Sequence, residues 1–143
     1  MSRIKIVLPD TFPFTTRFPV RITDLNYGGH AGNDAILAMI HEIRMQFLAA
    51  FGLTELDFGG AGLIMSDVGI EFRAELYYGE TVIASAAIAN LGKVAFDIYY
   101  KLEKETENGP LLVASARTGM VCFDYSVKKI VSIPENAKKL LGA

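Results

Sequence analysis

The residues best suited to chemistry lie close together in one short segment of the chain. Five polar side chains, two of them carboxylates and one an imidazole, fall within eleven residues: Asp24, Asn26, His30, Asn33 and Asp34. An imidazole at such a place can orient a nucleophile or transfer a proton. Asn and Gly are also the usual residues of a polar loop that caps a helix, so a purely structural interpretation remains open.

The segment that follows this loop predicts a helix over residues 34–51. Apolar residues recur there at spacings of three and four, namely Ile36, Ile40, Ile43, Phe47 and Phe51. Asn33 or Asp34 is the expected N-cap, and Gly52 the expected stop. The opposite face carries further apolar residues (Leu37, Ala38, Met45 and Leu48), so we expect the helix to be largely enclosed. Its free N–H groups could stabilise an oxyanion.

The remaining elements that must position this loop are strands. We expect strands at 17–23, 68–74, 81–90, 94–103 and 111–124, with turns at 78–80, 91–93 and 108–110, and a short closing helix over 133–141. Short turns join antiparallel neighbours. The predicted fold is therefore α+β, an antiparallel sheet wrapped around one long central helix, which is the hotdog fold.

Composition limits the class of protein. The 143 residues are 51% hydrophobic with a formal charge of −2, which predicts a single domain over 1–143 and argues against nucleic-acid binding. Every apolar run is too short to span a membrane. The single cysteine, Cys122, excludes an internal disulfide and indicates a reducing, cytoplasmic location. With only two histidines we expect no metal and no cofactor.

The loop and several later segments carry a family resemblance. Residues 24–33, DLNYGGHAGN, resemble the D-x-D-x-x-G-H-V-x-N loop of the 4-hydroxybenzoyl-CoA thioesterase group of hotdog proteins. Glu42-Ile43-Arg44 matches their E-x-R, Leu91-Gly92-Lys93 their L-G-K/R-S turn, and Ile133-Pro134 their closing I-P. The resemblance implies hydrolysis of a coenzyme A or acyl-carrier thioester by a homodimer or homotetramer.

One position departs from that pattern. The second acid of D-x-D is the usual catalytic carboxylate of the group, and here it is Asn26, as in plant acyl-carrier-protein thioesterases. An amide cannot act as a base, so the resemblance gives Asn26 an orienting role and His30 a polarising or proton-transfer role. Asp24 and Glu42 are the carboxylates available as base, with Asp67 a more distant candidate. Glu42 could equally be a surface residue paired with Arg44 or Gln46.

The resemblance also implies contacts with the substrate. The loop residues expected to make them are Tyr27, Gly29, Ala31, Gly32 and Asn33, with the oxyanion held by backbone N–H groups near Ala31 to Asn33. Arg73 and Lys93 are candidates for the phosphates of the coenzyme. A non-hydrolytic acyl-CoA or acyl-carrier binding module of the same fold is the alternative. A hotdog dehydratase is a third possibility, but the usual placement of its His and its Glu or Asp is not evident in this sequence.

Overall fold

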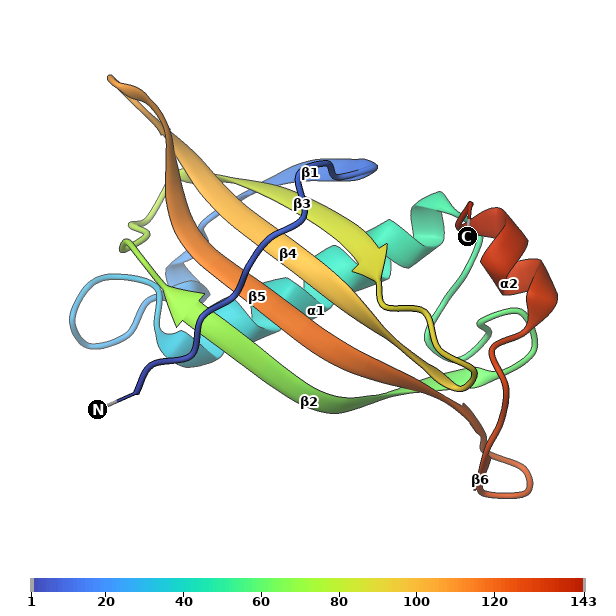
Figure 1. The fold of residues 1–143 in the computed structure, drawn as a ribbon. Helices are drawn as coiled ribbons and strands as arrows, with labels where there is room; N and C mark the ends of the chain where they lie inside the picture. The colour runs from blue at the N-terminus through green and yellow to red at the C-terminus, as the bar shows by residue number, and fades with distance from the viewer. Residues whose placement is uncertain (1, 143) are drawn as a thin grey trace.

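The computed structural model describes residues 2–142. In chain order its elements are β1 (Phe14–Pro19), a 3-10 turn (Ile22–Asp24), α1 (Asn33–Ala50), β2 (Gly62–Phe72), β3 (Thr81–Ala89), β4 (Ala95–Thr106), β5 (Gly109–Asp124), β6 (Lys129–Ile130) and α2 (Glu135–Leu140). The strands form one antiparallel sheet of order β1-β3-β4-β5-β2, with β6 paired to the end of β5. The sheet curves around α1, as the sequence predicts (Figure 1).

Alternating side chains on β4 show why the sheet wraps the helix. Phe96, Ile98, Tyr100 and Leu102 are all at most 2% exposed, whereas the residues between them are partly accessible on the opposite face. This period of two places one face of the sheet against the core. The other long strand of the centre, β5, contributes small side chains to the same face, including Ala114 and Ala116.

The helix α1 has one buried face rather than being enclosed on all sides. Ile36, Ile40, Ile43 and Phe47 pack into the core at 4% exposure or less. The opposite face differs from the prediction, because only Leu48 of its apolar residues is buried while Leu37 and Met45 are 39% and 38% exposed. The sheet reaches around only part of the helix, and an apolar stripe of α1 faces outward.

Several predicted boundaries were wrong. The first strand covers 14–19 instead of 17–23, because Asp24 accepts a hydrogen bond from the backbone N–H of Arg21 and closes a 3-10 turn there. The N-cap is Gly32, not Asn33 or Asp34. The second strand begins six residues earlier than expected, at Gly62, and has a register shift between Met65 and Asp67.

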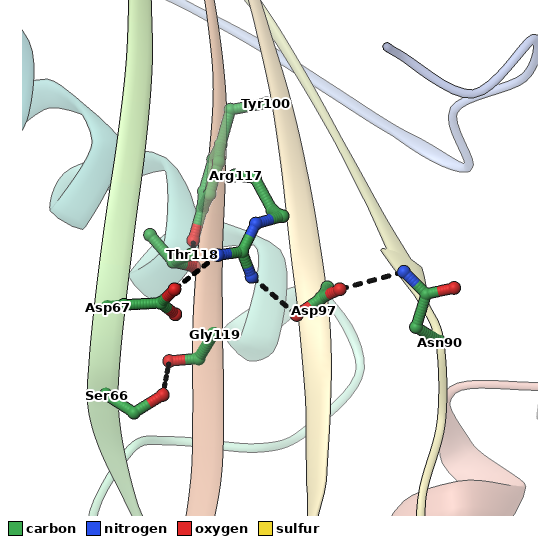
Figure 2. Close-up of polar contacts among 8 residues, drawn as sticks. All are labelled: Ser66, Asp67, Asn90, Asp97, Tyr100, Arg117, Thr118 and Gly119. Carbon is green, nitrogen blue, oxygen red and sulfur yellow. Dashed lines mark hydrogen bonds and ion pairs between the residues drawn. The ribbon is translucent and has the colours of Figure 1, made fainter. Parts of the chain in front are cut away.

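Polar networks on both faces of the sheet tie neighbouring strands together (Figure 2). On the outer face, Arg117 of β5 bridges Asp67 of β2 at 2.5 Å and Asp97 of β4 at 2.8 Å. On the inner face, the hydroxyl of Tyr100 lies 2.7 Å from that of Thr118, and burial raises the pKa of Tyr100. The two sides of the sheet therefore carry separate polar connections.

A buried cation of α1 joins this inner network. Arg44 donates to Glu55 at 2.9 Å and to the Tyr100 hydroxyl at 3.3 Å, while only 5% of the residue is exposed. Burial alone would lower the pKa of Arg44, but Tyr100 and Glu55 together raise it above its ordinary value. Arg44 is thus a charged residue of the core, held by partners from the sheet and from the segment after α1.

Candidate active site

The loop of residues 24–33 is held as a tight turn by its own backbone. The N–H of Asn26 donates to the His30 carbonyl at 2.9 Å, and the N–H of Gly29 donates to the Asn26 carbonyl at 3.1 Å. Gly29 has a φ of 81°, which favours glycine there. The role of Gly29 is therefore conformational: it lets the chain reverse so that His30 returns to the start of α1.

A cavity of about 300 Å³ lies between this loop, the first turn of α1 and the segment that follows β2. It brings together four residues that the sequence analysis selected, His30, Ala31, Asn33 and Arg73. The rest of its lining is mostly apolar, with one additional carboxylate: Ile36, Phe72, Ala74, Glu75 and Leu76. An apolar cavity with a few convergent polar groups is typical of a small-molecule site.

The imidazole of His30 is oriented from two directions. Its Nδ1 lies 3.1 Å from the Ala31 carbonyl, which can only accept a hydrogen bond, so Nδ1 carries the proton. In the neutral ring, Nε2 then has its lone pair free, and it lies 3.7 Å from Oε1 of Glu75. His30 is thus arranged to take a proton at Nε2, with a carboxylate beside the positive charge that this creates.

The N-terminus of α1 supplies hydrogen-bond donors, but not all of those expected. The N–H of Ala31 donates to the Leu76 carbonyl at 2.8 Å and that of Gly32 donates to the Asp24 carbonyl at 3.2 Å, so neither can hold an oxyanion. The first helical N–H groups have no partner inside a helix. Among the described residues, no acceptor is bonded to the N–H of Asn33, which lines the cavity. Of the three positions expected to supply a donor, Asn33 is therefore the one whose N–H is available.

Asn26 lies beside the cavity without lining it. Its Oδ1 accepts the N–H of Gly28 at 2.8 Å, so the side chain stabilises the turn. A Cβ added to Gly28 would lie 3.2 Å from Asn26 Oδ1 and 3.4 Å from His30 Nε2, which places both polar groups around Gly28. This geometry fits an orienting residue that fixes the loop carrying His30.

The two carboxylates proposed as base lie elsewhere. Asp24 is 7% exposed and its carboxylate is bonded to Arg21, whereas Glu42 is exposed and accepts a 2.7 Å hydrogen bond from Gln46. Both line a different cleft of about 190 Å³ between β1 and α1, which shares no lining residue with the His30 cavity. The surface interpretation of Glu42 is the one the structure favours, and Asp67 is paired with Arg117 on the outer face.

The remaining predicted contacts lie outside the cavity. Tyr27 projects fully into solvent and Gly29 is also exposed. The carbonyl of Lys93 accepts a hydrogen bond from Ile133, next to α2, so the turn containing Lys93 lies at the end of the molecule away from the 24–33 loop (Figure 1). Within this chain, Lys93 cannot act at the His30 cavity.

Glu75 is the functional candidate that sequence reasoning missed. It follows β2 and lies 45 positions along the chain from its partner His30. Its other carboxylate oxygen accepts the Tyr77 hydroxyl at 2.5 Å. The only signal in the sequence was a carboxylate placed two residues after Arg73, which does not by itself indicate a partner so distant in sequence.

Comparison with known proteins identifies the family. The model of the Thioesterase-like superfamily matches residues 20–141, which include the loop, α1, every strand of the sheet except β1, and α2. The chain belongs to this superfamily. Within residues 2–142 of this thioesterase-like protein, no cluster of three or more His, Cys, Asp or Glu side chains could hold a metal, and no helix is long and apolar enough to cross a membrane.

Individual relatives of the thioesterase-like protein agree with this assignment. It is 27% identical over 110 residues to a 1,4-dihydroxy-2-naphthoyl-CoA hydrolase of Microcystis aeruginosa, covering 75% of this chain and 77% of that one. A Synechocystis 1,4-dihydroxy-2-naphthoyl-CoA thioesterase superposes with a TM-score of 0.79 at 21% identity, covering 90% of this chain and 95% of that one. The 4-hydroxybenzoyl-CoA thioesterase of Pseudomonas sp. strain CBS-3 superposes with a TM-score of 0.79 at 14% identity, covering 91% of this chain and 99% of that one. The structural likeness confirms the hotdog fold.

Proposed function

We propose that the protein hydrolyses an acyl-CoA thioester to the free acid and coenzyme A, with His30 as the general base. The observation that carries this proposal is the fixed orientation of His30, whose Nδ1 is held by the Ala31 carbonyl while Nε2 lies at the cavity beside Glu75. Family membership and the acyl-CoA thioesterases among the relatives support the same reaction.

The reaction follows from these groups. Water attacks the thioester carbonyl carbon while Nε2 of His30 accepts a proton from the water. The carbonyl oxygen becomes an oxyanion, which the free N–H of Asn33 and the N-terminal end of the α1 dipole stabilise. The tetrahedral intermediate then collapses, the C–S bond breaks, and the imidazolium returns its proton to the departing sulfur. The products are a carboxylic acid and the thiol of coenzyme A.

The acyl group would occupy the apolar part of the cavity, formed by Ile36, Phe72 and Leu76. Relatives named for 1,4-dihydroxy-2-naphthoyl-CoA, 4-hydroxybenzoyl-CoA and gentisyl-CoA make aromatic acyl groups the first to test. A panel of aromatic and straight-chain acyl-CoAs, with release of free thiol as the readout, tests the proposal. We expect enzyme-dependent thiol release from at least one of them, and none with any member of the panel would refute hydrolysis.

A binding module without hydrolytic activity is the second candidate. The specific observation in its favour is Asn26, which occupies the usual position of the catalytic acid, while Asp24 and Glu42 both lie outside the cavity. This candidate predicts that acyl-CoA binds, as seen by calorimetry, but that no thiol is released. The same panel therefore separates the two functions.

We also propose that the protein works as a homodimer in the cytoplasm, where a lone buried thiol such as Cys122 stays reduced. The edge strand β2 exposes Ile64, Met65 and Val68, each at 37–38%. Beside it, α1 exposes Leu37 and Met45. An unpaired apolar edge of this kind is a natural site for pairing with a second copy. Light scattering should give at least twice the 15.6 kDa chain mass, and a stable monomer would contradict the proposal.

A further inference from the structure

A second cavity next to the active-site cavity is built from the N-terminal arm, here residues 2–13. Its volume is about 340 Å³ and its lining consists of Arg3, Ile4, Ile70, Glu71, Phe72 and Arg73. Two of these residues, Phe72 and Arg73, also line the His30 cavity. The two cavities are therefore adjacent at the end of β2, so that one extended ligand can occupy both.

The arm is held in place by contacts with the outer face of β2. The N–H of Ile6 donates to Oε1 of Glu71 at 3.2 Å. A Cβ added to Gly69 would lie 3.4 Å from the Ile6 side chain and 3.7 Å from that of Ile4, which is ordinary van der Waals contact, so the arm packs directly over β2 at this position. Figure 1 shows the arm crossing the sheet toward the end where β2 finishes. These contacts bring Arg3 to the cavity.

The charges of this second cavity favour an anion. Arg73 pairs with Glu71 at 3.0 Å, while Arg3 has no carboxylate partner among residues 2–142. With two guanidinium groups and one carboxylate in its lining, the cavity has a local excess of one positive charge, although the whole chain carries −2. A guanidinium presents paired N–H donors that match the oxygens of a phosphate.

The uncharged part of the lining suits a nucleobase. Phe72 is 48% exposed and lies with Ile4 and Ile70 beside the two arginines. An accessible aromatic ring offers a face on which a base can stack. Guanidinium groups beside an exposed aromatic ring are a combination that suits a phosphorylated nucleotide.

We propose that the N-terminal arm completes a site for the phosphorylated nucleotide of coenzyme A, in which Arg3 and Arg73 bind phosphate and Phe72 contacts the base. This inference rests on the proposed function. It assigns the thioester to the His30 cavity and the nucleotide to the adjoining one, and it selects coenzyme A over a carrier protein as the thiol carrier, because a carrier-bound arm brings no nucleotide.

The test compares two substrates that share an acyl group, an acyl-CoA and the corresponding acyl-pantetheine, which lacks the nucleotide. Arg3→Gln should raise the KM for acyl-CoA by about tenfold, the effect of losing a charge-assisted hydrogen bond, and leave kcat nearly unchanged. The KM for acyl-pantetheine should not move. Lys5→Gln is the matched control, because Lys5 is an exposed cation of the same arm that does not line the cavity.

Failure of this inference is distinguishable from failure of the proposed function. If the parent protein hydrolyses both substrates with equal KM, or if Arg3→Gln raises both KM values equally or neither, the nucleotide site is wrong and hydrolysis stands. If the parent hydrolyses neither substrate, the proposed function is wrong, and calorimetry with coenzyme A alone decides the site. Weaker binding of coenzyme A by Arg3→Gln than by Lys5→Gln would then support the nucleotide site. Equal binding by the two variants, or no binding of coenzyme A at all, would overturn it.

Discussion

Replacing Glu75 by Gln tests the electrostatic partner of His30. The carboxylate lies 3.7 Å from Nε2, the atom that gains a proton during attack by water. A neutral amide of nearly the same shape preserves packing and removes only the charge. We therefore expect the substitution to raise the free energy of the transition state, in which His30 becomes positive, more than that of the bound substrate.

The size of the effect follows from distance and exposure. Two unit charges about 4 Å apart interact by about 1 kcal/mol in water and about 4 kcal/mol near a protein surface. The Glu75 side chain is 55% exposed and that of His30 is 30% exposed, which favours the lower end of this range. A loss of about 1.4 kcal/mol corresponds to about a tenfold decrease in kcat.

The assay is thiol release under saturating acyl-CoA, at low and at high salt. Glu103→Gln is the control, because Glu103 forms an ion pair with Lys101 at the same 3.7 Å separation but lies outside the cavity. The difference between the parent and Glu75→Gln should shrink at high salt, since ions screen an exposed pair. A Glu75→Gln protein with the kcat of the parent at low salt would refute the electrostatic role.

Three further predictions address stability, reactivity and the loop. Arg44→Met removes the guanidinium from Glu55 and leaves the His41 imidazole, 3.1 Å away, beside that carboxylate. Because Glu55 is partly exposed, we expect a loss of about 2–3 kcal/mol in the free energy of unfolding, below the full cost of breaking a buried pair, measured with urea. Burial raises the pKa of Cys122 to about 11, so a thiol reagent near neutral pH should react only after unfolding, and rapid labelling of the native protein would contradict this. Asn26→Ala should lower kcat/KM strongly while Asn26→Asp retains it. Full activity of Asn26→Ala would contradict the assignment of the 24–33 loop to the active site.

Elements with a clear period were predictable from sequence. The spacing from Ile36 to Phe47 places α1 within one residue of its observed start, and the alternation around Phe96 and Ile98 places β4 and its buried face. The first strand was misplaced because the ion pair and hydrogen bond between Arg21 and Asp24 close a turn that no apolar pattern reveals. Local side-chain bonding to the backbone competes with strand formation there.

The candidate site was predictable only where it is local in sequence. His30, Ala31 and Asn33 belong to one loop and helix start, so their proximity follows from the sequence itself. Glu75 and Arg3 reach the same region through strand pairing and through the arm packed on β2, neither of which a motif encodes. The exposed apolar face of α1 was predicted to be buried. A sequence pattern shows that a helix face is hydrophobic, but it does not show whether the same chain covers that face.

The most direct test of the account is the kcat/KM of His30→Ala with the best acyl-CoA of the panel, measured on protein whose circular dichroism and melting match the parent. We predict a loss of about 10²–10⁴-fold, the usual contribution of a general acid–base group. A folded His30→Ala protein with undiminished kcat/KM would contradict the assignment of His30 as the base.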